Sequence, residues 1–195
     1  MKTKLFFISS LLSFTLLFSA CSKDDKDELQ VGDSYQGGYI AYILQQGDPG
    51  YDANVKHGLI AAPSDQSTGM QWYNGTSVVT GATDQAIGAG ASNTSTIVSV
   101  QGDGSYAAKL CDDLVIGSYS DWYLPSKNEL YKLYLNKVKI GGFDSVDYWS
   151  STEFNDVNVA NQYQAYDINF YSGATTDVGY MSKASTFHVR AVRSF

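Results

Sequence analysis

The chain has 195 residues, of which 20 are Asp or Glu and 13 are Lys or Arg, so its formal net charge is −7. Charged residues make up only 17% and hydrophobic residues 44%, which excludes a disordered chain, and the acidic balance argues against a nucleic-acid partner. Two cysteines and two histidines exclude a scaffold of several disulfides and a site built from several histidines. We therefore expect one folded domain that binds no nucleic acid.

The first twenty residues have the pattern of a secretory signal peptide. Two lysines near the N-terminus precede Leu5–Phe18, a 14-residue apolar stretch interrupted only by Ser and Thr. A bilayer span needs about 20 apolar residues, so this stretch is too short for a membrane helix. The small residues Ser19 and Ala20 follow, directly before Cys21. We predict that residues 1–20 are a signal peptide that is removed.

Cys21 is the expected site of lipid attachment. The sequence Leu17–Cys21 (LFSAC) resembles a bacterial lipobox, in which the cysteine is acylated and becomes the first residue. The alternative is an ordinary signal peptide with a chance cysteine. Each buried CH₂ of an acyl chain contributes about 0.8 kcal/mol of membrane affinity, so several chains would anchor the protein to the membrane. The resemblance implies an outer-membrane lipoprotein of a Gram-negative bacterium.

Residues 21–32 are predicted to be a flexible acidic tether. The segment Ser22–Glu28 contains charged residues and no apolar side chain around which a fold could form. It resembles the surface-export signal of Bacteroidota lipoproteins, which implies exposure at the cell surface. A plain flexible linker, with the protein facing the periplasm, is the alternative. Residues 33–195 then form a single domain, because no linker or internal repeat divides them.

Short apolar runs near the start of this domain predict buried strands. Gly38–Leu44 (GYIAYIL) and Gly58–Ala62 (GLIAA) are bounded by turn-forming residues. Two helices are expected farther along the chain. Asn93 is a suitable N-cap for Thr94–Gln101, and Ser105 can cap a helix that continues to Leu114.

The strongest local pattern predicts a third helix. Ser126 and Glu129, three residues apart, have the spacing of a capping box. The following residues place Leu130 and Leu133 on one helical face, and two glycines at 141 and 142 are expected to end the helix.

The last third of the chain has a β pattern. Tyr166 and Ile168 alternate with Asp167 and Asn169, which is typical of a half-buried strand. Four segments are predicted to be strands: Tyr148–Thr152, Gln162–Phe170, Thr175–Ser182 and Phe187–Phe195. The predicted class is α+β, with an antiparallel sheet and two or three helices in the first two-thirds of the chain.

Three ordered motifs resemble those of one bacterial family. They are Asp121–Leu130 (DWYLPSKNEL), Tyr148–Glu153 (YWSSTE) and Val189–Arg193 (VRAVR). Together they are similar to the Lcl C-terminal-domain family, and the resemblance covers roughly residues 37–195. It implies a fold similar to C-type-lectin-like domains and to formylglycine-generating enzymes, the sulfatase-modifying factors.

The motif residues are expected to support the fold more than to form a site. Trp122 and Trp149 would each bury on the order of 200 Å² in the core. We expect Arg190 to pair with Glu129 or Asp121. The motif residues interpreted as mainly structural are Trp122, Leu124, Pro125, Glu129, Trp149, Ser150, Ser151, Thr152, Arg190 and Arg193.

Catalysis is not expected. The oxidases among the similar proteins need a pair of cysteines for copper, because soft thiolates select Cu(I). If Cys21 is acylated, only Cys111 remains, on an apolar helical face where a core role is expected. His57 and His188 lack partners at the sequence spacing of metal ligands. The prediction is a protein that is not an enzyme and has no cofactor, with a diverged oxidase as the remote alternative.

Ligand binding is expected at a polar loop that begins at Glu153. Such a loop carries ligands in C-type-lectin-like domains, sometimes around calcium, and the oxygen donors here suit Ca²⁺, above all at Asp156 and Asn158. A plain polar turn is the alternative. The candidate ligand-binding residues are Glu153, Asp156, Asn158, Asn161 and the surface residue Tyr171.

The leading hypothesis is a lipid-anchored, surface-exposed binding or adhesion domain that recognises a glycan or an extracellular protein. The lipobox, the acidic tether and the resemblance to an adhesin's terminal domain motivate it. A non-catalytic envelope scaffold or assembly subunit is the second hypothesis.

Overall fold

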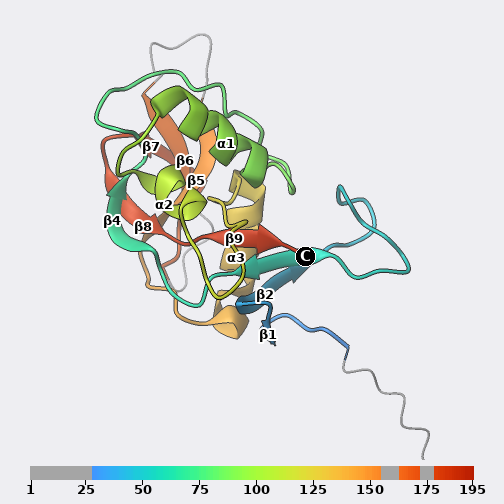
Figure 1. Cartoon of the computed structure of the whole chain (residues 1–195). Coiled ribbons are helices and arrows are strands. Elements are labelled where there is room, and N and C mark those ends of the chain that lie inside the picture. Colours follow the sequence, from blue (N-terminus) through green and yellow to red (C-terminus); the bar gives the residue numbers. More distant parts are fainter. Residues whose placement is uncertain (1–27, 155–162, 172–177) are drawn as a thin grey trace, which may run out of the picture.

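The α+β class predicted from the sequence is confirmed. The computed structural model of the protein describes residues 28–154, 163–171 and 178–195. These contain three α-helices and nine strands in two sheets. Figure 1 shows how the elements are arranged. All three helices precede the fifth strand and the last of them ends at Ile140, ten residues beyond the predicted first two-thirds of the chain; the part that follows is β.

A four-stranded antiparallel sheet joins the first described strands to the last one. In spatial order its strands are β1 (Ser34–Tyr35), β2 (Gly38–Ile43), β3 (Gly58–Ala61) and β9 (Val192–Ser194). The two predicted N-terminal strands are therefore present, as β2 and β3. Gly38 allows these strands to approach closely, because a Cβ at this position would lie 2.2 Å from the carbonyl oxygen of Ala61.

A five-stranded sheet forms the second half of the fold. In spatial order its strands are β4 (Ser67–Gln71), β8 (Thr186–Val189), β5 (Asp147–Phe154), β6 (Gln164–Asn169) and β7 (Val178–Ser182). Neighbouring strands are antiparallel except β5 and β8, which are parallel where Tyr148 pairs with His188. The expected antiparallel sheet thus contains one parallel pair, and this pair places two polar side chains side by side.

The third helix begins as its capping pattern predicts. In α3 (Lys127–Ile140), the Ser126 hydroxyl accepts a hydrogen bond from the Glu129 amide over 3.3 Å. The Ser126 amide donates to the Glu129 carboxylate over 2.8 Å, which completes the capping box. Gly141 follows with φ of 76° and ends the helix. α3 packs against β2 of one sheet and against β5 and β6 of the other, so it joins the two sheets.

The first two helices are present but begin at other residues than predicted. α1 spans Gly90–Gln101, so the predicted cap Asn93 lies inside it. Its side chain donates to the carbonyl oxygen of Asp84 over 2.6 Å, and this contact outside the helix explains why a polar residue is placed there. α2 spans Ala107–Asp112, and Ser105 lies one residue before its N-cap.

The predicted C-terminal strand Phe187–Phe195 is two strands that belong to different sheets. β8 ends at Val189 and β9 begins at Val192, and the two residues between them carry the chain from one sheet to the other. The apolar pattern continues across this break, because Val189, Ala191 and Val192 are all buried in the core. β4 was not predicted, because its sequence STGMQ has no apolar alternation.

Side chains of β6 contribute to buried clusters on both faces of the five-stranded sheet. Ala165 of β6 belongs to a buried cluster that contains Trp149, whereas Ile168 of the same strand belongs to a second cluster with Leu130 of α3. Asp167, which the alternation predicted to face solvent, is only 4% exposed, whereas Tyr166, predicted to face the core, is partly exposed. The predicted burial was therefore wrong for Asp167. None of the helices in the described ranges is long and apolar enough to cross a membrane.

Candidate functional site

The tryptophans of the family motifs are core residues. Trp122 is 2% exposed and Trp149 is fully buried, and both belong to the same cluster as Leu124. The indole of Trp149 donates to the carbonyl oxygen of Met70 over 2.8 Å, which joins β5 to β4. These side chains have no access to a ligand, as the structural interpretation of the motif requires.

Glu129 combines the capping box with a contact to a distant loop. Its carboxylate accepts hydrogen bonds from the amides of Ser126 and Gly88, each over 2.8 Å, and from the hydroxyl of Tyr123 over 3.4 Å. Burial raises the pKa of the Glu129 carboxyl above its usual range, while the two amide donors act in the opposite direction. The motif glutamate therefore fixes the start of α3 against the segment before α1.

The consecutive hydroxyl residues of the second motif are also used within the protein. Ser150 donates to the carbonyl oxygen of Tyr166 over 2.7 Å. Thr152 donates to the Asp84 carbonyl and accepts from the amide of Lys127, each over 3.0 Å. Ser151 is fully buried, and its amide donates to the carbonyl oxygen of Pro125 over 2.8 Å. The motif thus binds β5 to the start of α3.

The expected partner of Arg190 was wrong. Its Nε donates to Oδ1 of Asp65 over 2.6 Å, and the other guanidinium nitrogens donate to the carbonyl oxygens of Ala62 and Gly142. Asp121, one of the two predicted partners, instead pairs with Arg193 through two bonds of 2.7 and 2.8 Å. Arg190 lies in the two-residue break between β8 and β9, so it points to a different part of the fold from Arg193.

Glu153 lies at the end of β5 and is not the exposed loop residue that the sequence suggested. It is 2% exposed and forms a buried ion pair with Lys183. Its carboxylate also accepts hydrogen bonds from the amides of Thr80 and Gly81 over 2.9 and 2.7 Å. Both carboxylate oxygens are bound to groups of the protein itself, so Glu153 is not available to a ligand.

The other predicted binding residues are placed in different ways. Tyr171 is described and is 61% exposed, so it remains accessible to a ligand. The candidates Asp156, Asn158 and Asn161, with the calcium site expected at the first two, lie outside the described residues. The lipidation site Cys21 also lies outside them.

A partly exposed group of aromatic rings lies at the C-terminal end of β5. We call Phe154, Tyr166 and Tyr180 the aromatic platform. The rings of Phe154 and Tyr180 stack at 4.0 Å with an angle of 12°, and Tyr166 meets Tyr180 edge-on at 6.3 Å. Tyr180 is 47% exposed, and the ammonium of Lys127 lies 4.6 Å from the centre of the Tyr166 ring. The platform could not be predicted from local sequence patterns, because its three rings come from three strands.

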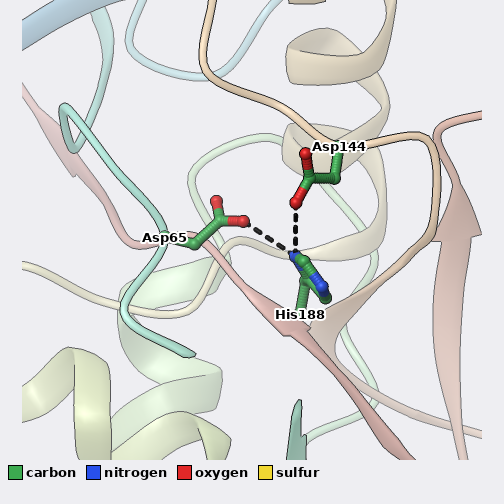
Figure 2. Close-up of side chains that lie close together, drawn as sticks. All are labelled: Asp65, Asp144 and His188. Atoms are coloured by element: carbon green, nitrogen blue, oxygen red, sulfur yellow. Dashed lines mark hydrogen bonds and ion pairs between the residues drawn. The ribbon is translucent and has the colours of Figure 1, made fainter. Parts of the chain in front are cut away.

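A second group joins polar side chains from three distant segments (Figure 2). Nδ1 of His188 on β8 lies 2.8 Å from Oδ2 of Asp65 and 3.9 Å from Oδ2 of Asp144. The hydroxyl of Tyr148 donates to the same oxygen of Asp65 over 2.8 Å. His188 has no partner at the sequence spacing of metal ligands, but the fold brings two distant carboxylates to it. Because Asp65 and His188 are 123 residues apart, no local spacing could reveal this cluster.

Residues 62–193, which contain all three motifs, match the family model described as the Lcl C-terminal domain. The match covers more than half of the chain. The chain belongs to the Lcl C-terminal domain family. The resemblance seen in the motifs is thereby confirmed, and in this member of the family the motif side chains are core and capping groups.

One solved structure similar to this Lcl C-terminal domain is the crystal structure of a fimbrial protein from Bacteroides ovatus ATCC 8483. The TM-score is 0.55 at 18% sequence identity, so the two proteins share a fold. The similarity covers 86% of this chain and 45% of the fimbrial chain, so this chain spans less than half of that protein's length. No curated protein sequence matches the chain.

Proposed function

We propose that this protein is a lipid-anchored, surface-exposed binding or adhesion domain that recognises an extracellular glycan or protein through the aromatic platform. The stacked rings of the platform at the C-terminal end of β5, with Tyr180 47% exposed, are the observation that carries this proposal. The lipobox at Cys21 and the acidic tether of residues 21–32 support an outer-membrane anchor and display at the cell surface.

The platform has the properties of a recognition surface. Tyrosine and phenylalanine offer large, rigid contact areas, and tyrosine is among the residues that contribute most to binding energy in interfaces. The stacking of Phe154 on Tyr180 holds both rings in place before a ligand arrives, which lowers the entropy cost of binding. Lys127 at the margin adds a cation and a hydrogen-bond donor for hydroxyl or carboxylate groups.

A role without catalysis fits the same residues. The thiol of Cys111 is fully buried, and burial raises its pKa, so the thiolate that nucleophilic or copper chemistry needs is disfavoured. The carboxylates of Glu129 and Glu153 are both bound to groups of the protein itself. We therefore propose that the protein is not an enzyme.

A glycan array and a pull-down from intact cell envelopes test the ligand class. We expect saturable binding to a glycan or to a soluble extracellular protein, and reduced binding after Tyr180→Ala. If the pull-down instead recovers a stable stoichiometric envelope partner, and Tyr180→Ala does not change this, the protein is an assembly subunit. Repeating the binding with and without added Ca²⁺ tests the calcium proposed at Asp156 and Asn158.

Protease treatment of whole cells tests the location. We expect the native protein to be cleaved from intact cells, and Cys21→Ala to release it from the membrane fraction. A protein that is protected in intact cells and cleaved only after the outer membrane is opened would contradict surface display.

A further inference from the structure

We propose that Asp65, Asp144 and His188 bind one divalent first-row transition-metal ion, with Zn²⁺ as the representative ion. This cluster lies apart from the aromatic platform and is independent of the proposed function. It combines one imidazole nitrogen with two carboxylates, a ligand set that zinc accepts, and its three donor atoms lie within 4.8 Å of one another.

The distances between the donor atoms suit a tetrahedral ion. Metal–nitrogen and metal–oxygen bonds of about 2.0–2.2 Å place neighbouring ligand atoms about 3.3 Å apart in a tetrahedron. Nδ1 of His188 lies 2.8 Å from Asp65 and 3.9 Å from Asp144, on either side of that value. Figure 2 shows both carboxylates pointing at the same ring nitrogen. Shifts of about 0.5 Å by side-chain rotation would bring both of these distances to that value.

Two residues hold the proposed ligands in place. The buried Arg190 donates to the second oxygen of Asp65 over 2.6 Å and to the carbonyl oxygen of Gly142, two residues before Asp144. The hydroxyl of Tyr148 donates to Asp65, accepts from the amide of Asp144 over 2.9 Å, and its ring contacts His188 edge-on at 5.2 Å. Such outer contacts orient metal ligands and raise metal affinity.

Charge and exposure also favour a cation. The two carboxylates outweigh the one guanidinium, so the cluster with a neutral imidazole carries a net negative charge. Asp144 is 70% exposed, whereas Asp65 and His188 are 10% and 12% exposed, so an ion reaches the site from the Asp144 side. The imidazole ligand favours a transition metal over Ca²⁺ or Mg²⁺, which prefer oxygen donors alone. The remaining coordination position faces solvent and would hold water.

A bound ion would join three segments of the chain. Asp65 lies between β3 and β4, Asp144 lies between α3 and β5, and His188 lies on β8. The unfolded chain does not hold these three ligands together, so the ion would bind only the folded protein. It would therefore raise the unfolding temperature as the ion concentration increases.

Calorimetric titration of the chelator-treated full chain with ZnCl₂ tests the site. We expect one Zn²⁺ per chain with micromolar or tighter affinity, and binding of Ca²⁺ or Mg²⁺ weaker by roughly a hundredfold or more. Asp144→Asn should weaken Zn²⁺ binding by about tenfold or more. Asp144 is exposed, so this variant should fold. Asp103→Asn, the same change on another exposed loop, is the matched control and should leave affinity unchanged.

A nitrogen-detected NMR spectrum identifies the ligand atom directly. The chain has two histidines, so His57 serves as the internal reference. We expect Zn²⁺ to shift the Nδ1 signal of His188 and to leave His57 unchanged. The proposal is overturned if no Zn²⁺ binds at millimolar concentration, if Asp144→Asn and Asp103→Asn bind equally well, or if His57 is the residue that shifts.

Discussion

Lys183 and Glu153 form an ion pair in which each side chain is only 1% exposed. The ammonium of Lys183 also donates to the carbonyl oxygen of Val78 over 2.8 Å and lies 4.8 Å from the ring of Trp72. Burial lowers the pKa of Lys183, and the Glu153 carboxylate acts in the opposite direction. The pair joins the turn after β7 to the end of β5, next to the aromatic platform.

Breaking this pair from one side should strongly destabilise the protein. Glu153→Gln keeps the shape of the side chain but removes the buried negative charge that pairs with Lys183. We expect the free energy of unfolding to fall by about 3 kcal/mol, measured by chemical denaturation. Glu28→Gln removes one partner of the exposed pair with Lys56 and should have no measurable effect. Equal stability of Glu153→Gln and the native protein would contradict this account.

The stability should also depend on the protonation of Asp167. Burial, and secondarily the charge of Asp147, raises the pKa of Asp167 from 3.8 to about 7. The folded protein therefore binds this proton more tightly than the unfolded chain, so the contribution of Asp167 to stability falls as the pH rises from about 4 to about 7.

Denaturation of Asp167→Asn at pH 5 and pH 8 checks this sign. The stability of the variant minus that of the native protein should be higher at pH 8 than at pH 5, by on the order of 1–3 kcal/mol. Asp103→Asn, in an exposed loop, should show no such gain. A difference between the Asp167 variant and the native protein that is the same at both pH values would show that Asp167 is ionised throughout.

Gly90 should not tolerate a side chain. A Cβ at this first residue of α1 would lie 2.2 Å from the Glu129 carboxylate and 2.7 Å from the Tyr123 ring. Gly90→Ala should therefore push Glu129 out of its hydrogen bonds and destabilise the protein by about 2 kcal/mol. Gly69→Ala is the control, because the nearest atom there is 4.0 Å away. Thermal unfolding measures both, and similar midpoints would contradict the packing described here.

The two motif arginines should respond differently to replacement by lysine. Arg190 is fully buried and donates to three acceptors, Ala62 and Asp65 in one segment and Gly142 in another, which a lysine cannot reach together. Arg190→Lys should cost about 3 kcal/mol of stability. Arg193 pairs with Asp121, which is 58% exposed, so Arg193→Lys should cost about 1 kcal/mol. The reverse order would contradict the roles assigned to the two residues.

Local patterns could be predicted from the sequence and distant pairings could not. The capping box of Ser126 and Glu129 is contained in four residues, and α3 forms as expected. The break between β8 and β9 was missed, because an apolar pattern does not say which sheet a strand joins. Asn93 was misplaced for a related reason, since its partner Asp84 lies outside the helix.

The site could be predicted only in part. The motifs identified the family, and their residues are core or capping groups as expected. Glu153 was assigned to a polar loop because its neighbours in sequence are polar, whereas its buried partner Lys183 is 30 residues away. The aromatic platform and the Asp65–Asp144–His188 cluster each combine residues from three segments, and a single sequence carries no signal of such contacts.

The central claim is that the aromatic platform binds the ligand, and Tyr180 tests it most directly. The measurement is the affinity of Tyr180→Ala and of the control Tyr51→Ala for a glycan or protein selected with the native protein, with folding checked by circular dichroism. Tyr51 is 42% exposed, close to the 47% of Tyr180. Our account predicts at least about tenfold weaker binding for Tyr180→Ala and unchanged binding for Tyr51→Ala. Equal affinities of Tyr180→Ala and the native protein would contradict it.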